Sequence, residues 1–308
     1  MNGRALRSLG REAACFYASR DGARAREFAA QLGGRGSFAS YQAALQSPEV
    51  DVAVILTPPS SHLELTLAAL AAGKHVVVEK PPFLRASDFD AVERAQARAG
   101  RQTLVAENYY YKPIAVHLRR QLASGVIGDV LFLHVNALKE QRVSGWRTDP
   151  GLAGGGALFE GGIHWVNFMA NLGLVPRSAR GMEPAPRGVQ RSVLALFDYE
   201  GGAVGTLFHS WEVPSPLRGL RISRIYGREG TLTFESNGLF LLVWGKRRAL
   251  IVPGLRDIAG RGAMWRDFVT ALRTGGRAEM DLSRARRDLE LVESIQGPQS
   301  PEGKEPGC

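Results

Sequence analysis

The stretch Val50–Phe83 constrains the fold more than any other part of this chain, because it contains a complete strand–helix–strand unit. Val52–Leu56 is a short apolar run, as found in strands that are buried on both faces. Two prolines end that run, and the following helix ends at Gly73, which suits the left-handed geometry of a helix C-terminus. His75–Val78 is a second buried strand. Two short buried strands joined by a helix predict a parallel sheet with helices packed on it.

One lysine follows the second strand, in the tripeptide Glu79-Lys80-Pro81. In open α/β sheets, ligands bind at the carboxyl ends of the strands. Only six of the 39 basic residues are lysines, so a generic positive charge here would usually be arginine. Chemistry that needs a compact ammonium able to shift its pKa cannot use arginine. The simpler interpretation of Lys80 is a solvated side chain at a strand end.

Length and composition indicate a two-domain protein with a sizeable core, since the chain has 308 residues of which 44% are hydrophobic. We expect neither a membrane span, which needs roughly 20 apolar residues in a row, nor a secretory signal. Cys15 and Cys308 are too few and too far apart for a disulfide framework or a metal cluster. This cysteine usage predicts a cytoplasmic protein without a metal site.

The net charge of +9 comes from arginines spread over the whole length. Such a charge can attract a phosphate-bearing cofactor, and a compositional preference for Arg, Ala and Gly explains it equally well. No dense basic run is interleaved with aromatic residues, so we expect no nucleic-acid partner.

Helices and strands alternate through residues 1–107, which predicts a doubly wound, Rossmann-like parallel sheet and places the chain in the α/β class. Besides the unit above, the expected elements are helix Arg4–Leu9, strand Ala13–Ala18, helix Ala23–Leu32, helix Ala86–Ala99 and strand Thr103–Ala106.

Residues 108–296 show a different order, with strands and helices in blocks, which predicts an α+β domain whose large, mainly antiparallel sheet has helices on one face. The expected helices are Pro113–Ser124, Ala157–Leu172, Ala263–Thr274 and Leu282–Ile295, and the expected strands are Val130–Leu138, Ser192–Tyr199, Ala203–Trp211, Arg221–Tyr226, Thr231–Glu235 and Leu239–Trp244. Residues 297–308 are expected to form a disordered tail.

The start of the chain lacks a feature that the rest of the pattern requires. A dinucleotide-binding fold opens with a strand and a glycine-rich turn before its first helix. Asn2–Gly10 reads like the second half of that helix, and no G-x-G-x-x-G precedes it. The missing strand would be central, so strand Ala13–Ala18 would lose its inner partner. Either the active protein begins further upstream, or the chain is a truncated form with poor cofactor binding.

The end of strand Ala13–Ala18 bears on which cofactor is used. An acidic side chain would hold the ribose 2′-hydroxyl of NAD, and here Ser19 and Arg20 stand at that point. A hydroxyl and a guanidinium suit a 2′-phosphate, which favours NADP slightly over NAD. An ordinary loop arginine is an equally good explanation, and Asp21 could restore a preference for NAD.

A second group of chemically capable residues follows a glycine-rich loop, in GGGALFEGGIH. Glu160 and His164 are four residues apart and therefore share one face of the expected helix. Without further information, His164 is more simply a partly buried histidine beside Trp165. A metal site is disfavoured, because the pair lacks a third ligand at telling spacing.

Three segments taken together, TPPSSH, GKHVVVEKP and GGGALFEGGIH, resemble the NAD(P)-dependent oxidoreductases of the glucose-fructose oxidoreductase / inositol dehydrogenase / rhizopine-catabolism (Gfo/Idh/MocA) family. A lone Glu-Lys-Pro is a weak signal, whereas the three in this order are specific, and the resemblance extends from about Asn2 to Ile295. It implies an NAD(P) cofactor and a cleft lined by Thr57, Pro58, His62, Glu79, Lys80 and Pro81. A strand end and a helix start explain the first three residues equally well.

The resemblance also implies the chemistry. Hydride passes between a carbinol carbon and the nicotinamide, while His164 takes or gives the hydroxyl proton. Lys80 orients the substrate oxygen and stabilises the charge that develops on it. Glu160 orients His164 or contacts the substrate. The family usually has aspartate at this last position, and often another aspartate where Asn167 stands. Tyr109–Lys112 departs from an Arg-containing family segment.

We therefore expect an oxidoreductase that acts on the CH–OH or C=O group of a sugar, polyol or related small molecule. Family members commonly pair through their open C-terminal sheets, so the resemblance implies a homodimer or homotetramer. The alternative is a non-catalytic binding or scaffold protein that keeps the fold without the phosphate loop.

Overall fold

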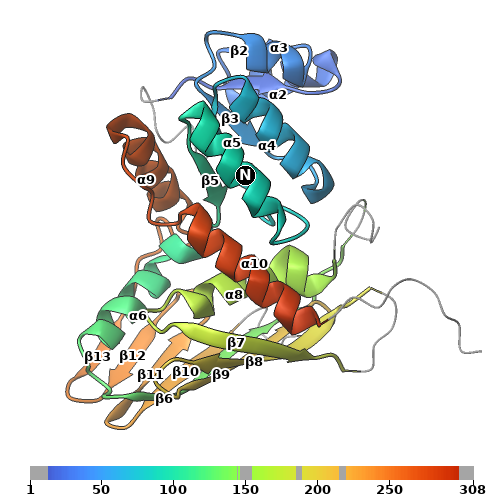
Figure 1. The fold of residues 1–308 in the computed structure, drawn as a ribbon. Helices are drawn as coiled ribbons and strands as arrows, with labels where there is room; N and C mark the ends of the chain where they lie inside the picture. Colours follow the sequence, from blue (N-terminus) through green and yellow to red (C-terminus); the bar gives the residue numbers. More distant parts are fainter. Residues whose placement is uncertain (1–12, 144, 146–154, 185–188, 215–219, 298–308) are drawn as a thin grey trace, which may run out of the picture.

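The computed structural model describes residues 13–143, 145, 155–184, 189–214 and 220–297. Helix Arg4–Leu9 and the tail at 298–308 lie outside these residues. The first domain carries short parallel strands and helices, and the second is built on an eight-stranded sheet (Figure 1). The predicted fold class is confirmed.

The elements of the first domain follow the predicted alternation of strands and helices. They are β1 (Phe16–Ala18), α2 (Gly22–Leu32), β2 (Gly36–Phe38), α3 (Tyr41–Gln46), β3 (Val52–Ile55), η2 (Pro59–Ser61), α4 (His62–Ala71), β4 (His75–Glu79), α5 (Asp88–Ala99) and β5 (Thr103–Ala106). The parallel pairing is in two pieces among the described residues, β1 with β2 and β3-β4-β5.

The strand–helix–strand unit forms as its sequence predicts. Val52 pairs with His75 and Ile55 with Val78 in parallel register. The central strand β4 is fully buried at Val76, Val77 and Val78 because helices and neighbouring strands cover it. Its last residue, Glu79, is followed directly by Lys80, which places the lysine at the carboxyl edge of the sheet.

The second domain contains six helical elements and a large sheet among its described residues. The helical elements are η3 (Asn108–Tyr111), α6 (Pro113–Ala123), η5 (Leu158–Gly162), α8 (Ile163–Ala170), α9 (Arg261–Thr274) and α10 (Leu282–Gln296). The strands are β6 (Val130–Leu138), β7 (Pro176–Met182), β8 (Ser192–Tyr199), β9 (Val204–Ser210), β10 (Ile222–Gly227), β11 (Gly230–Glu235), β12 (Leu241–Trp244) and β13 (Arg248–Ile251).

The large sheet has the order β13-β12-β11-β10-β6-β9-β8-β7. Only the β6–β9 pair is parallel, and the other ladders are antiparallel. The sequence analysis missed β7 and β13, which are the two edge strands. The strand β13 has only four residues, RALI, of which the last three are a continuous apolar run, so it shows no clear alternation. The sequence of β7, PRSARGM, has no apolar alternation to detect.

One face of this sheet is covered and the other is open. Figure 1 shows α6, α8 and α10 on the same side of the sheet. Along β6, Leu133, Val135 and Ala137 point into the core, while the alternating residue Phe132 is 57% exposed. The same alternation leaves Phe208, Leu242, Trp244 and Leu250 exposed on neighbouring strands.

The predicted helix Ala157–Leu172 is not one continuous α-helix. It opens with a π-helical turn, η5, and continues as α8 after Gly162. A Cβ atom on Gly162 would lie 2.7 Å from Leu158 Cδ1 and 3.2 Å from the ring of His209, so a side chain here would require Leu158 to shift. A π-helical turn widens the backbone and is often found at functional sites. Both Glu160 and His164 belong to this segment.

A buried polar cluster joins α8 to α10. Asn167 Nδ2 donates to Asp288 Oδ2 over 2.6 Å, and Asn171 Nδ2 donates to Asp288 Oδ1 over 3.2 Å. Burial raises the pKa of Asp288 to about 7. The amide of Asn167, where the family often has aspartate, therefore supplies the hydrogen-bond donor that this buried carboxyl group needs.

We predict that Asn167→Asp lowers the free energy of unfolding, by roughly 3 kcal/mol at pH 8, because it sets two carboxylates against each other in a buried site. The loss should be smaller at pH 5, where Asp288 is protonated and can share a proton with the new acid. Urea unfolding at the two pH values measures this. Gln42→Glu, an exposed amide-to-acid change on α3, is the control, and an equal effect from both variants would contradict the prediction.

Candidate active site

The three parallel strands β3, β4 and β5 end at one edge of their sheet. Thr57 follows β3 closely, Lys80 follows β4, and Glu107 follows β5. The chain reverses direction after each of these strands, so polar side chains gather there without interrupting the apolar strands. The carboxyl edge predicted from the sequence is therefore assembled from all three strands.

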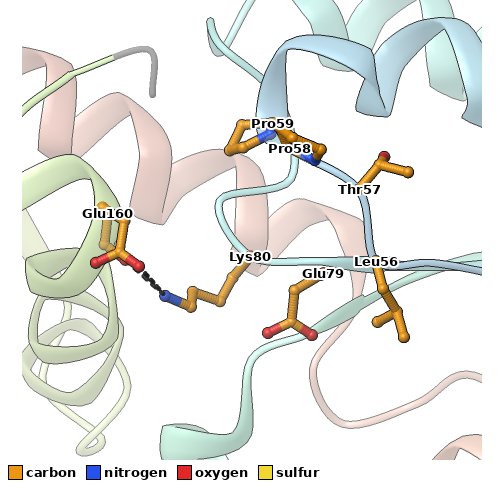
Figure 2. Close-up of a pocket in the computed structure, with 7 residues that line it drawn as sticks. All are labelled: Leu56, Thr57, Pro58, Pro59, Glu79, Lys80 and Glu160. Carbon is orange, nitrogen blue, oxygen red and sulfur yellow. Dashed lines mark hydrogen bonds and ion pairs between the residues drawn. The ribbon is translucent and has the colours of Figure 1, made fainter. Parts of the chain in front are cut away.

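A pocket of about 190 Å³ opens at this edge. Its lining consists of Leu56, Thr57, Pro58, Pro59, Glu79, Lys80 and Glu160. Figure 2 shows Lys80 and Glu160 extending toward each other from different domains, while Thr57 and the prolines come from the loop after β3.

Lys80 joins the two domains. Its Nζ donates to the backbone oxygen of Glu160 over 2.6 Å, and it lies 3.9 Å from Glu160 Oε1. This backbone oxygen belongs to the π-helical turn η5. One hydrogen bond uses one of the three N–H donors of an ammonium. The remaining donors are available to a bound oxygen.

A larger cavity of about 780 Å³ adjoins this contact. Lys80, Glu160 and His164 all line it. The ammonium and the imidazole, which come from different domains, therefore face one space. The rest of its lining comes from η3, the segment after β6, Gly161, Trp165 and the loops around Arg221, Asn237 and Arg261.

His164 is held by a carboxylate that the sequence analysis did not single out. Its Nδ1 lies 2.7 Å from Glu107 Oε1 and 2.8 Å from Oε2. The ring of Tyr109 stacks on the imidazole, with centroids 4.4 Å apart and an interplanar angle of 11°. The orientation of His164 is thus determined by Glu107 and Tyr109, while Glu160 contacts Lys80.

Burial shifts the pKa values of Glu107 and His164 in opposite directions. Glu107 is 2% exposed, and desolvation raises its pKa to about 7. The backbone N–H of Tyr109 and the charges of Lys80 and Lys112 act against that shift. Burial also lowers the pKa of His164 well below its usual value, with a further contribution from Lys80. The imidazole is therefore neutral at pH 7 and carries a single N–H.

His62 lies beneath the loops. It is buried, with Nδ1 2.9 Å from the Pro81 oxygen and Nε2 2.7 Å from the Thr57 oxygen. Burial lowers its pKa, although these backbone contacts oppose the shift. His62 thus ties the loop after β3 to the loop after β4.

The residues predicted to contact the ribose lie at the end of β1. Ser19 Oγ accepts a hydrogen bond from the Asp21 backbone N–H over 3.2 Å, and Arg20 is exposed. Asp21 caps α2, because its Oδ1 accepts from Ala23 N over 2.8 Å. Ser19 and Arg20 line neither of the two cavities that Lys80 lines, and β1 belongs to a different parallel sheet from β4.

Comparison with known proteins places both domains in one family. Residues 4–107 match a family model described as "Oxidoreductase family, NAD-binding Rossmann fold", and residues 115–233 match one described as "GFO/IDH/MocA C-terminal domain". The chain belongs to the Gfo/Idh/MocA family. The two matches come in the order in which the sequence predicts the two domains.

Curated relatives in this family include a dTDP-3,4-didehydro-2,6-dideoxy-alpha-D-glucose 3-reductase from Saccharopolyspora spinosa, 32% identical over 62% of this chain and 58% of the relative. Levoglucosan dehydrogenase from Pseudarthrobacter phenanthrenivorans is 28% identical over 70% of this chain and 60% of the relative. The aligned part of the chain thus spans about three fifths of the length of these relatives.

Among solved structures, an inositol dehydrogenase homologue complexed with NAD+ from Azotobacter vinelandii superposes with a TM-score of 0.81. It is 19% identical, and the match covers 96% of this chain and 90% of that chain. This similarity shows the Gfo/Idh/MocA fold for nearly the whole chain.

The pocket after β3 and β4 has the position of a ligand site in an open α/β sheet. It lies at the carboxyl ends of parallel strands, where ligands bind, and it shares Lys80 and Glu160 with the larger cavity. The described residues hold no cluster of three or more His, Cys, Asp or Glu side chains suited to a metal. No described helix is long and apolar enough to cross a membrane.

Glu107 was detectable in the sequence, because it directly follows strand Thr103–Ala106 at the same edge as Lys80. Its pairing with His164 was not detectable, since the two residues are 57 positions apart. Lys139 and Arg221 also line the cavity without having been singled out as site residues. Each lies next to the end of a strand of the large sheet. The alternation of apolar and polar residues does not extend beyond a strand, so it does not predict which way these side chains point.

We predict that His62→Ala loosens the pocket loops, because the two backbone carbonyls lose the ring that bridges them. Amide hydrogen exchange in residues 56–61 and 79–84 should become roughly tenfold faster or more, as expected for the loss of about 1–3 kcal/mol of local hydrogen bonding. Glu64→Ala, an exposed change on the same helix, should leave this exchange unchanged. Unaltered exchange in His62→Ala would contradict the bridging role.

Proposed function

We propose that this protein is an NAD(P)-dependent dehydrogenase or reductase that acts on the CH–OH or C=O group of a sugar, polyol or related small molecule. One observation carries the proposal: the Lys80 ammonium and the His164 imidazole come from different domains and line one cavity beside the sheet edge. The names of the curated relatives, a levoglucosan dehydrogenase and a nucleotide-sugar reductase, support a sugar-like substrate.

In this mechanism Lys80 binds the oxygen of the reacting carbon. One N–H of its ammonium donates to the Glu160 backbone oxygen, and this bond fixes the position of the ammonium. The remaining N–H groups are therefore presented to the substrate from a fixed position. A positive charge at this point stabilises an alkoxide as it develops during oxidation. The carboxylate of Glu160, 3.9 Å from Nζ, limits where the ammonium can move. The bound nicotinamide supplies the hydride chemistry at the carbon.

His164 moves the proton. When Glu107 is ionised, it accepts the Nδ1–H of the imidazole, and Nε2 is left with a lone pair that can take the hydroxyl proton. The imidazolium formed in that step is stabilised by the carboxylate against Nδ1. When Glu107 is protonated, it donates to Nδ1 instead, and the single N–H of the imidazole moves to Nε2. Glu107 therefore sets the tautomer of His164, as a positioning residue.

We propose NADP as the preferred cofactor over NAD, with Ser19 and Arg20 at the 2′-phosphate. The capping role of Asp21 supports this preference, because a carboxylate engaged with backbone N–H groups of α2 is less able to hold a ribose 2′-hydroxyl. Arg20 is exposed and able to meet a phosphate.

The proposal is tested first by binding. We expect NADPH to saturate the purified chain with a change in nicotinamide fluorescence, and Arg20→Ala to weaken NADPH binding about tenfold while sparing NADH. Absence of binding up to roughly millimolar NADPH and NADH would favour a non-catalytic protein of the same fold. Equal affinity for the two cofactors would remove the NADP preference alone.

We predict that Lys80→Met and His164→Asn each lower turnover of a sugar substrate by roughly 100-fold or more, because each removes a group that acts on the reacting oxygen or its proton. Steady-state rates, with circular dichroism to verify folding, measure the effect. Lys246→Met, on the exposed end of the large sheet, is the matched control. Near-normal turnover in either active-site variant would refute the role given to that residue.

We predict that kcat/KM for sugar oxidation rises as the pH increases through about 7, because Glu107 ionises there and frees Nε2 of His164 as a base. In Glu107→Gln this inflection should disappear, and the rate at pH 8 should fall roughly tenfold or more. Glu107→Asp should retain an inflection at reduced rate. A Glu107→Gln profile identical to the unaltered protein would show that Glu107 does not set the tautomer.

We propose that two copies pair through the open face of the large sheet, within the cytoplasm. Exposed apolar side chains on β6, β9, β12 and β13 support this, since a face of this kind is stabilised by burial. Light scattering should find a dimer or tetramer, and Phe132→Glu together with Leu242→Glu should yield a monomer. Phe28→Glu, an exposed apolar residue on α2, should leave the assembly unchanged; a monomeric parent protein would refute the pairing.

A further inference from the structure

The larger cavity contains more positive charge than the proposed hydride transfer requires. Besides Lys80, four cationic side chains line it, namely Lys112, Lys139, Arg221 and Arg261. They come from separate segments of the C-terminal domain, at the end of η3, after β6, before β10 and at the start of α9. A nicotinamide dinucleotide places its phosphates at the N-terminal helix of a Rossmann domain. These four cations are therefore not explained by the cofactor.

Two of these cations are deeply buried. Lys112 is 4% exposed and Arg221 is 7% exposed. Lys112 Nζ lies 4.5 Å from the ring centroid of Tyr109, and the Arg221 guanidinium lies 5.4 Å from that of Trp165. Burial of a cation is costly unless it is paired. The aromatic faces offset part of that cost but provide no anion.

The neighbouring carboxylates are fewer than the cations, and each also contacts another group. Glu160 contacts Lys80, and Glu107 contacts His164. Glu235 is a counter-charge that acts on both Lys112 and Arg221. Its oxygens also accept from backbone N–H groups of Asn237, Gly238, Leu239 and Arg221. Two buried cations therefore share this one carboxylate. Glu140, which also lines the cavity, is exposed to solvent.

Arg221 has hydrogen-bonding capacity to spare. One of its terminal nitrogens donates to Asn237 Oδ1, while its buried Nε has no hydrogen-bond partner in the part of the chain that the structure describes. Lys139 stands at the same end of the adjacent strand, because β6 and β10 run antiparallel as neighbours. Its ammonium makes no hydrogen bond or ion pair with the described residues. The two cations also repel each other, which lowers the pKa of Lys139 further than burial alone.

We infer that the substrate is an anionic sugar, bearing a carboxylate or a phosphate ester, and that Lys139, Arg221 and Lys112 bind its charged group. The inference rests on the proposed function for the identity of the site, and it adds the substrate class. An anion at this point would pair two buried cations and relieve the repulsion between Lys139 and Arg221. Arg221 can present two N–H groups to a carboxylate or phosphate, which gives direction as well as charge. Arg261 adds positive charge at the same cavity.

The test measures binding rather than turnover. The purified chain, with and without NADPH, is titrated calorimetrically with glucose, glucuronate and glucose 6-phosphate, and with the corresponding galactose and mannose series. We expect at least one charged sugar to bind about tenfold or more tightly than its neutral parent, and tighter binding at low salt. A uronate preference identifies a carboxylate, and a sugar-phosphate preference identifies a phosphate ester.

Variants test which residues bind the charged group of the sugar. Lys139→Gln should weaken binding of the charged sugar about tenfold or more and change binding of the neutral parent little, because the Lys139 ammonium makes no hydrogen bond or ion pair with the described residues. Arg221→Lys, which keeps the charge and loses the fork, should weaken binding without unfolding the chain. Arg228→Gln, an exposed cation at the other end of β10, should have no effect.

The inference is overturned if no charged sugar binds more tightly than its neutral parent up to roughly 10 mM, or if Lys139→Gln and Arg228→Gln act alike. Failure of the proposed function gives a different result. A chain that binds charged sugars through Lys139 but neither binds NADPH nor turns over any sugar would refute the dehydrogenase assignment and retain the anion site.

Discussion

The contact between the Lys80 ammonium and the Glu160 backbone oxygen is the interaction on which the rest of the site depends. It spans 2.6 Å and joins the carboxyl edge of one domain to the π-helical turn of the other. Because a strand end and a helix turn are both rigid, this single hydrogen bond determines the position of the ammonium in the cavity. The same turn continues into α8, which carries His164. The separation of the two chemically active groups is thus determined by backbone geometry.

Around that contact, burial raises the pKa of Glu107 and lowers the pKa of His164. In water near pH 7, Glu107 would be ionised and His164 would be partly protonated. In the buried site the neutral form of each residue is accessible near pH 7, because the charged forms are poorly solvated. The proton that the pair shares decides whether Nε2 of His164 donates or accepts. Two proton states near neutrality suit a reaction that runs as oxidation or reduction.

The cations that the C-terminal domain contributes to the cavity have a different physical role. Lys112 and Arg221 are buried against aromatic rings, and nearby carboxylates are already engaged with other groups. Two buried cations that share one carboxylate favour a ligand that supplies a second negative charge. In the proposed mechanism the Glu107–His164 pair and these cations would act on different parts of one bound molecule, which would orient the substrate.

The order of apolar runs, prolines and glycines was enough to predict the parallel unit, the antiparallel sheet and the placement of Lys80 at a strand end, because these follow from local periodicity. The edge strands β7 and β13 carry no such pattern, and the π-helical turn has the same composition as an α-helix. Glu107 reaches His164, and Lys139 reaches the neighbourhood of Arg221, only through pairing of distant segments. Tertiary structure alone decided these contacts, since desolvation and charge proximity depend on what the rest of the chain packs around each group.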